Sequence, residues 1–144
     1  MFTSILVGLD FSPASLRALA EACELGRRLD LPVRALHVVE MPYPSYFPTY
    51  ATLGDPAWFR THEPKVQAKL DESLAPHPGV TSLIRQGNPA ERLLMEATAD
   101  TLIVIGHVGH SRWEHLLFGS TAASVARHAP GSVWIVRADR PAPS

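Results

Sequence analysis

The chain has 144 residues, 46% of them hydrophobic and 19% charged, and its formal net charge is −1. This length fits one domain, and the balance of residues is that of a globular protein rather than a disordered one. Because there is no excess of positive charge, neutralisation of phosphates cannot drive binding to a polyanion, so we expect no nucleic-acid partner. The only cysteine, Cys23, excludes a disulfide within the chain.

The hydrophobic residues are spread in short runs. None approaches the roughly 20 residues that a membrane span requires. The first residues, MFTSILVGLDF, have no basic residue before their apolar stretch and no small-residue cleavage site after it. We therefore expect a strand at this position rather than a secretion signal, and a cytoplasmic protein that does not enter the membrane.

The first forty residues predict a strand, a helix and a second strand. Short apolar runs at Ser4–Leu9 and Val33–Val39 are typical of buried parallel strands. Between them, Ser12 and Pro13 have the residue types of an N-cap and a first helical position, and Pro32 ends the helix. Apolar residues recur near helical spacing at Leu16, Leu19, Ala20, Cys23 and Leu25.

The rest of the chain continues this alternation after a loop. The stretch from Met41 to Pro56 contains four prolines, so we expect it to be irregular. Beyond it the pattern predicts a helix at Trp58–Leu74 that contains Pro64 in its interior, and then a strand at Val80–Arg85. These are followed by a helix capped by Asn88 and reaching about Thr98, a strand at Thr101–Ile105, a helix at Ser120–His128 and a strand at Val133–Val136.

Strands alternating with helices predict an α/β fold, a doubly wound parallel sheet with helices on both faces. We expect five strands in the order 3-2-1-4-5. In such sheets ligands bind beyond the carboxyl ends of the strands, where the strand order reverses. Here that point lies between Asp10, after the first strand, and Gly106, after the fourth.

The segment Gly106–Thr121, GHVGHSRWEHLLFGST, follows the fourth strand and leads into a helix. Gly106 and Gly109 lack side chains that would keep a phosphate from the backbone, and Gly119 opens a helix whose free N–H groups attract anions. From spacing alone, glycines after a strand are more often plain turn residues. The position of the segment is what indicates a phosphate site.

The spacing Gly, two residues, Gly, nine residues, Gly-Ser in this segment resembles that of the nucleotide-binding universal stress proteins. The opening ILVGLDFSPAS and the closing HAPGSVWIVR resemble the first and last elements of that family. The resemblance covers Phe2–Arg137 and is weakest from Met41 to His77. It implies one adenine-nucleotide-binding domain across residues 1–144, in a protein that serves the stress response.

This resemblance also implies which residues touch the nucleotide. Asp10 matches the acidic residue that faces adenosine, although it could instead only cap the turn before Ser12. Val38 matches the residue whose main chain meets adenine, and it can be an ordinary core valine as well. The phosphates would be held by Gly106, Gly109, Gly119 and Ser120, with Thr121 as a neighbouring candidate.

The expected ligand is ATP, with Mg or Mn held only through its phosphates. The chain has no GxxxxGK[ST] loop, and Arg112 is the one fixed cation in the glycine segment, so we expect at most slow hydrolysis and assign no catalytic residue. The alternative is a stress-response dimer of the same fold that binds no nucleotide and acts through protein partners. Trp113, if its indole points inward, would narrow the phosphate site.

Two further features of the sequence are less specific. His107, His110 and His115 with Glu114 have the residue types of zinc ligands but no recognised ligand spacing, so we assign no metal site to the protein. Tyr43, Tyr46 and Tyr50 in the proline-rich loop could form a lid over the nucleotide or could pack on the domain or a partner.

The last strand predicts how the protein assembles. Ser132–Arg137, SVWIVR, is apolar, contains no proline and belongs at the edge of the expected sheet. Such an edge invites pairing. Together with the family resemblance, this predicts a homodimer formed through Ser132–Arg137, the alternative being a monomer whose tail shields the edge.

Overall fold

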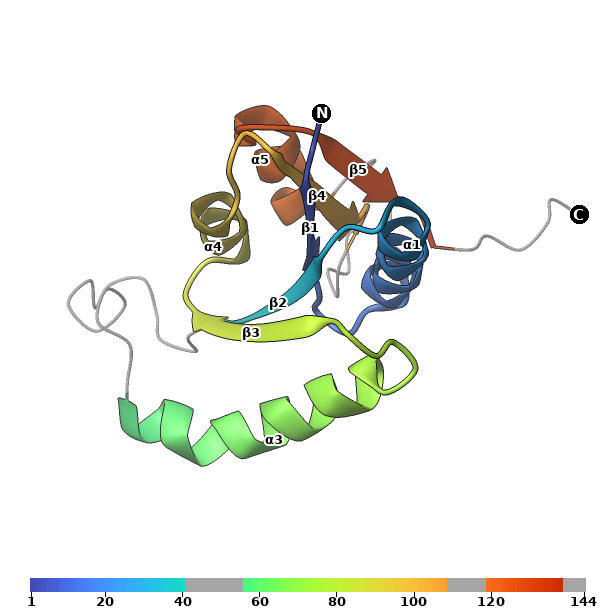
Figure 1. Cartoon of the computed structure of the whole chain (residues 1–144). Helices are drawn as coiled ribbons and strands as arrows, with labels where there is room; N and C mark the ends of the chain where they lie inside the picture. Colours follow the sequence, from blue (N-terminus) through green and yellow to red (C-terminus); the bar gives the residue numbers. More distant parts are fainter. Residues whose placement is uncertain (41–55, 109–118, 139–144) are drawn as a thin grey trace, which may run out of the picture.

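A computed structural model describes residues 1–40, 56–108 and 119–138. Its strands are β1 (Ser4–Gly8), β2 (Val33–Val39), β3 (Thr81–Gln86), β4 (Thr101–Gly106) and β5 (Val133–Val136). They form one all-parallel sheet in the order β3-β2-β1-β4-β5, as Figure 1 shows. The predicted fold class and strand order are confirmed.

Four described helices connect the strands and lie on both faces of the sheet (Figure 1). They are α1 (Pro13–Leu29), α3 (Pro56–Leu74), α4 (Pro89–Glu96) and α5 (Ser120–His128). Helix α4 ends earlier than the expected Thr98, because Ala97 is already extended. Helix α3 runs through Pro64, as expected, and begins at Pro56, two residues before the expected Trp58. The proline-rich loop and its tyrosines lie outside the described residues.

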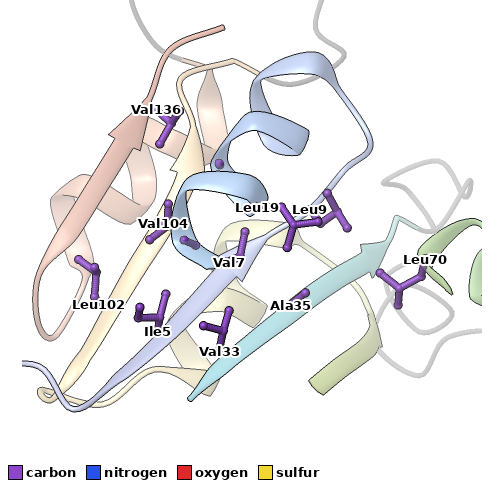
Figure 2. Packing of buried hydrophobic residues seen from close by; sticks show 12 residues of the cluster. Ile5, Val7, Leu9, Leu19, Val33, Ala35, Leu70, Leu102, Val104 and Val136 are labelled. Atoms are coloured by element: carbon purple, nitrogen blue, oxygen red, sulfur yellow. The ribbon is translucent and has the colours of Figure 1, made fainter. Parts of the chain in front are cut away.

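The core has two halves, one on each face of the sheet. On one face, inward residues of β1, β2 and β4 pack against α1 and against Leu70 of α3, and Figure 2 shows this half between Val136 at one side and Leu70 at the other. On the other face, Leu6, Leu36 and Ile103 pack against α4 and α5. The alternation of side chains along strands places each residue in its half.

Helix α1 buries a face of small residues that sequence periodicity did not select. Ala18 and Ala22 are fully buried, whereas Leu16, expected on the buried face, is 40% exposed, and Ala20 is exposed too. The reason is close approach: a Cβ atom on Gly26 would lie 2.5 Å from Val33 Cγ2. A helix that lies so near the sheet contacts it through small residues.

The predicted caps set where the helices begin. Ser12 Oγ accepts a hydrogen bond from Ser15 N at 3.3 Å, and Pro13 follows as the first residue of α1. Asn88 Oδ1 likewise accepts from Glu91 N at 3.0 Å ahead of α4. Both helices therefore start at the carboxyl edge of the sheet. Within the described ranges, no helix has the length and apolar character needed to cross a bilayer.

Candidate functional site

A cavity of about 600 Å³ opens at the carboxyl ends of β1, β2 and β4. The start of α5 closes one end of it, and the start of α4 contributes Pro89 and Leu93. This is the point where the strand order reverses, since β1 lies between β2 and β4. Its volume lies in the range of small-molecule binding sites. The remaining lining residues are Gly8, Leu9, Asp10, Ser15, Leu36, His37, Val38, Val39, Glu40, Ile105, Gly106, His107, Val108, Gly119, Ser120, Thr121 and Ala122.

Asp10 lines this cavity and also shapes the turn between β1 and α1. Its Oδ1 accepts hydrogen bonds from Ser12 N at 2.9 Å and from Ser12 Oγ. Its backbone N–H donates to Ser15 Oγ at 3.3 Å. Asp10 therefore does cap the turn before Ser12, which the sequence left as an alternative. These hydrogen bonds also hold its carboxylate at the cavity wall.

His37 is a second polar residue of this wall, and the sequence analysis did not single it out. Its Nδ1 donates to the carbonyl of Leu9 at 2.7 Å, and its ring lies 4.6 Å from that of Phe11, centroid to centroid. Lys69 of α3 places its ammonium 4.8 Å from the centre of the Phe11 ring. Phe11 has a positive φ of 65°, which is rare outside glycine. No sequence pattern predicted these contacts, because they join residues that lie far apart in the sequence.

Val38 offers its main chain to the cavity. On β2, the carbonyl of Leu36 accepts from Leu9 N at 2.9 Å, so Leu36 faces β1, while the carbonyl of Val39 accepts from Gly87 N on the β3 side. Because the main-chain groups of a strand alternate between its two neighbours, those of Val38 point to the β1 side. Strand β1 has ended there, at Gly8. The N–H and C=O of Val38 therefore face the space where a ligand would lie.

Gly106 lines the cavity, but the packing of α1 also requires a glycine there. A Cβ atom at this position would lie 2.8 Å from Ala14 Cβ and 2.9 Å from Ser15 N. Such distances to backbone atoms cannot be relieved by turning a side chain. The glycine that the resemblance assigns to phosphate binding thus has a structural role as well.

The start of α5 forms the other end of the cavity. Gly119 is its N-cap with an extended backbone, and among the described residues no side chain caps the helix. Gly119 N donates to the carbonyl of His107 at 2.7 Å, so the first N–H groups that remain for a ligand belong to Ser120 and Thr121. Those groups and the helix dipole favour an anion at this end.

His107 joins this end to the sheet. Its N–H donates to the carbonyl of Val136 at 2.8 Å, and its carbonyl accepts from Gly119. Its Nδ1 is buried and, within the described residues, is the one buried side-chain polar atom with no hydrogen-bond partner. Such an atom is costly to leave unsatisfied and fits a site that is completed by a ligand.

The charges in the cavity are unevenly placed. Asp10 and Glu40 contribute carboxylates at the β1 and β2 end, whereas the α5 end offers N–H groups and hydroxyls. No lysine or arginine occurs among the described lining residues. These ranges also contain no cluster of three residues suited to hold a metal ion. The cavity therefore has polar groups at both ends and apolar side chains between them, such as Leu36 and Ile105.

The structure thus brings six of the seven predicted site residues to one cavity: Asp10, Val38, Gly106, Gly119, Ser120 and Thr121. Gly109, the other glycine assigned to the phosphates, lies outside the described residues. The same holds for Arg112, Trp113 and the histidines His110 and His115.

The chain matches the model of the Universal stress protein family over residues 1–137. A universal stress protein of Mycolicibacterium smegmatis is 31% identical to it over 144 residues, an alignment that covers 92% of this chain and 45% of the relative. The chain spans about half the length of the curated relatives it matches.

Solved structures share the fold. The universal stress protein UspA from Lactobacillus plantarum matches with a TM-score of 0.69 and 26% identity, covering 94% of this chain and 98% of that one. A universal stress protein in complex with cAMP matches with a TM-score of 0.63 and 24% identity, over 96% of this chain and 99% of that one. The universal stress protein from Archaeoglobus fulgidus in complex with dAMP matches with a TM-score of 0.58 and 19% identity, covering 94% of this chain and 98% of that one. With its sequence, fold and cavity in agreement, this chain belongs to the universal stress protein family.

Proposed function

We propose that the protein binds ATP in the cavity at the carboxyl edge of its sheet and acts as a regulatory protein of the stress response. The observation that carries this proposal is the pairing of two unlike ends in one cavity. The main chain of Val38 lies at one end and the uncapped start of α5 at the other. Main-chain groups in an apolar slot recognise a base, and a helix N-terminus recognises phosphates.

The cavity lining supplies groups that suit the contacts proposed for Asp10, Ser120 and Thr121. Asp10, held by Ser12, has a carboxylate that accepts hydrogen bonds from ribose hydroxyls. Ser120 and Thr121 supply N–H and hydroxyl donors to phosphate oxygens. Family members bound to cAMP and dAMP support an adenine nucleotide as the ligand class.

Turnover of ATP needs more than binding. Phosphoryl transfer requires cations placed on the charge that develops in the transition state. The described lining contains carboxylates and no lysine or arginine. A Mg or Mn ion carried by the phosphates would supply the positive charge, and hydrolysis in this site would be slow at most. We assign the protein to the cytoplasm, where ATP is available.

A substitution at the start of α5 tests the proposal. Gly119 has a φ of −68°, which valine adopts without strain, and a valine at this position would retain the N–H that bonds to His107. Its added side chain would occupy space that the phosphates need. We expect Gly119→Val to abolish ATP binding measured by calorimetry, while the circular dichroism spectrum of the protein stays unchanged.

Ala123→Val is the matched control. Ala123 lies on the same helix, is exposed and does not line the cavity. This variant should bind ATP as the wild type does. Equal ATP affinity in the wild type and in Gly119→Val would contradict the assignment of this site.

A second candidate function is kept because β5 forms an edge of the sheet. A family member that binds no nucleotide would act as a homodimer through Ser132–Arg137 and recruit protein partners. A measurement of nucleotide binding distinguishes the two functions. The oligomeric state does not, since a homodimer is compatible with both.

A further inference from the structure

We infer that His107 recognises the phosphates of the bound nucleotide, donating a hydrogen bond from Nδ1 to a phosphate oxygen. The inference rests on the proposed function and adds to it a residue that the glycine spacing does not assign. It starts from an unusual atom: Nδ1 of His107 is buried and without a partner among the described residues, while its residue lines the cavity.

The direction of the His107 side chain follows from the strand before it. Ile103 and Ile105 belong to the half of the core under α4 and α5. Gly106 faces the opposite side, since a Cβ atom there would touch Ala14 of α1. Because side chains alternate and the ladder continues through the bond from His107 N to Val136, the imidazole lies on the α5 side.

The backbone of His107 is fixed at both polar groups. Its N–H is bonded to β5, and its carbonyl accepts from Gly119, the N-cap of α5. The second bond sets the residue directly beside the helix N-terminus that would hold the phosphates. The backbone of His107 is therefore already ordered, so it loses little conformational entropy when a ligand binds.

The chemistry of the ring selects the ligand atom. A neutral imidazole carries its proton on either nitrogen, so Nδ1–H is an available form. A phosphate oxygen is an acceptor, and hydrogen bonds to ionised acceptors are the stronger ones. Binding of the phosphate would thereby satisfy the buried nitrogen. The same contact would be absent for adenosine, which has no phosphate.

Three variants and two ligands test this reading by calorimetry. His107→Leu removes the polar atoms and should weaken ATP binding about tenfold, the size of one hydrogen bond, with no change for adenosine. His107→Asn places an amide near the position of Nδ1 and should restore most of the ATP affinity. His107→Gln reaches instead to the position of Nε2 and should restore less.

The outcomes that would overturn the inference are distinct. Unchanged ATP affinity in His107→Leu, an equal loss for adenosine, or no advantage of Asn over Gln would each exclude a phosphate contact from Nδ1. If the wild type binds no adenine nucleotide, the proposed function falls and this inference with it. Should His107→Leu fail to fold, ¹⁵N NMR of the wild type decides: the Nδ1 signal of His107 shifts with ATP and not with adenosine, or the inference is wrong.

Discussion

Individual residues at the cavity serve the fold and the site at once. Asp10 caps the turn that starts α1 and also forms the cavity wall. Gly106 allows α1 to approach β4 and also lines the cavity. A substitution at such a position changes stability and binding together, so a loss of binding there is ambiguous. Gly119 and His107 are better places to test the ligand.

Gly106→Ala should destabilise the protein by about 1–3 kcal/mol, as overpacking of a core does. The added methyl group would meet backbone atoms of Ala14 and Ser15 at 2.9 Å, and these cannot move without shifting α1. Gly8→Ala is the matched control at the end of the neighbouring strand. Its methyl group would meet Ile105 Cγ2 and Leu93 Cδ1 at 3.0 and 3.1 Å, so only side chains have to shift by a few tenths of an ångström and the backbone does not. Urea unfolding of both variants checks this, and an equal loss in the two would contradict it.

His37 predicts a pH dependence of stability. Burial lowers the pKa of its imidazole, as does the ammonium of Lys69, against the opposing effects of the Leu9 carbonyl and Asp10. At pH values between the lowered pKa of the folded protein and the pKa of about 6.5 in the unfolded chain, the unfolded chain binds more protons than the folded one. The free energy of unfolding therefore falls as the pH falls through this range. For one group the slope is at most about 1.4 kcal/mol per pH unit.

The test of this dependence is urea unfolding between pH 5 and 7.5. His37→Asn keeps a donor for Leu9 but no longer titrates, so the contribution of this site to acid destabilisation should disappear. His128→Asn removes an exposed histidine of α5 and serves as the control. A stability difference between wild type and His37→Asn that stays constant with pH would show that His37 does not titrate in this way.

At the scale of elements, polar contacts hold the end of α4 to the sheet. Arg34 of β2 donates to the carbonyl of Glu96 at 2.9 Å and pairs with its carboxylate at 3.4 Å. Arg85 of β3 pairs with the same carboxylate at 3.1 Å. One arginine thus satisfies a carbonyl that the helix end leaves free, and α4, which contributes to the cavity, stays in place.

Arg34→Met should cost about 1–2 kcal/mol in the free energy of unfolding, because it removes charge-assisted bonds that are only partly exposed. Arg28→Met is the control, since Arg28 makes an exposed pair with Glu24 within α1. Its expected cost is much smaller, because water and salt screen an exposed ion pair. Chemical denaturation measures both, and a similar effect of the two substitutions would show that the Glu96 contacts do not hold α4.

Elements were more predictable from sequence than contacts. Apolar runs and cap residues placed the five strands and the starts of α1 and α4, because these signals are local. Periodicity failed for the buried face of α1, where packing distance selects Ala18 over Leu16. Periodicity also did not predict the contact between the rings of His37 and Phe11, because these residues lie far apart in the sequence. The alternation of strands and helices located the site between Asp10 and Gly106, but the roles of the site residues came from a motif and a family resemblance, since a single-sequence pattern does not show which atoms face a ligand.

At the scale of the whole molecule, β5 forms one edge of the sheet, and among the described strands it pairs with β4 alone. Ile103 N and His107 N donate to the carbonyls of Ser132 and Val136, so the even-numbered residues of β5 face β4. By alternation, Val133 and Ile135 turn their N–H and C=O groups to the outside. These are the groups that a second copy of the chain would pair with in the proposed homodimer.

Ile135→Pro should therefore shift the protein from dimer to monomer, because it removes an N–H that faces the partner. Ile135→Ala shortens the same side chain but keeps that N–H, and it should remain dimeric. Light scattering coupled to size exclusion measures both masses. A wild type that stays monomeric at high protein concentration would overturn the dimer, and a dimeric Ile135→Pro would exclude pairing through this edge.

The central claim is that the cavity between β1, β2, β4 and α5 holds an adenine nucleotide. It is tested most directly by purifying the wild-type protein without added nucleotide, denaturing it and identifying by mass spectrometry what it releases. We predict an adenine nucleotide released by the wild type in an amount comparable to the protein, and none by Gly119→Val purified in parallel. Wild-type protein that releases none and that also fails to bind added ATP would contradict the claim.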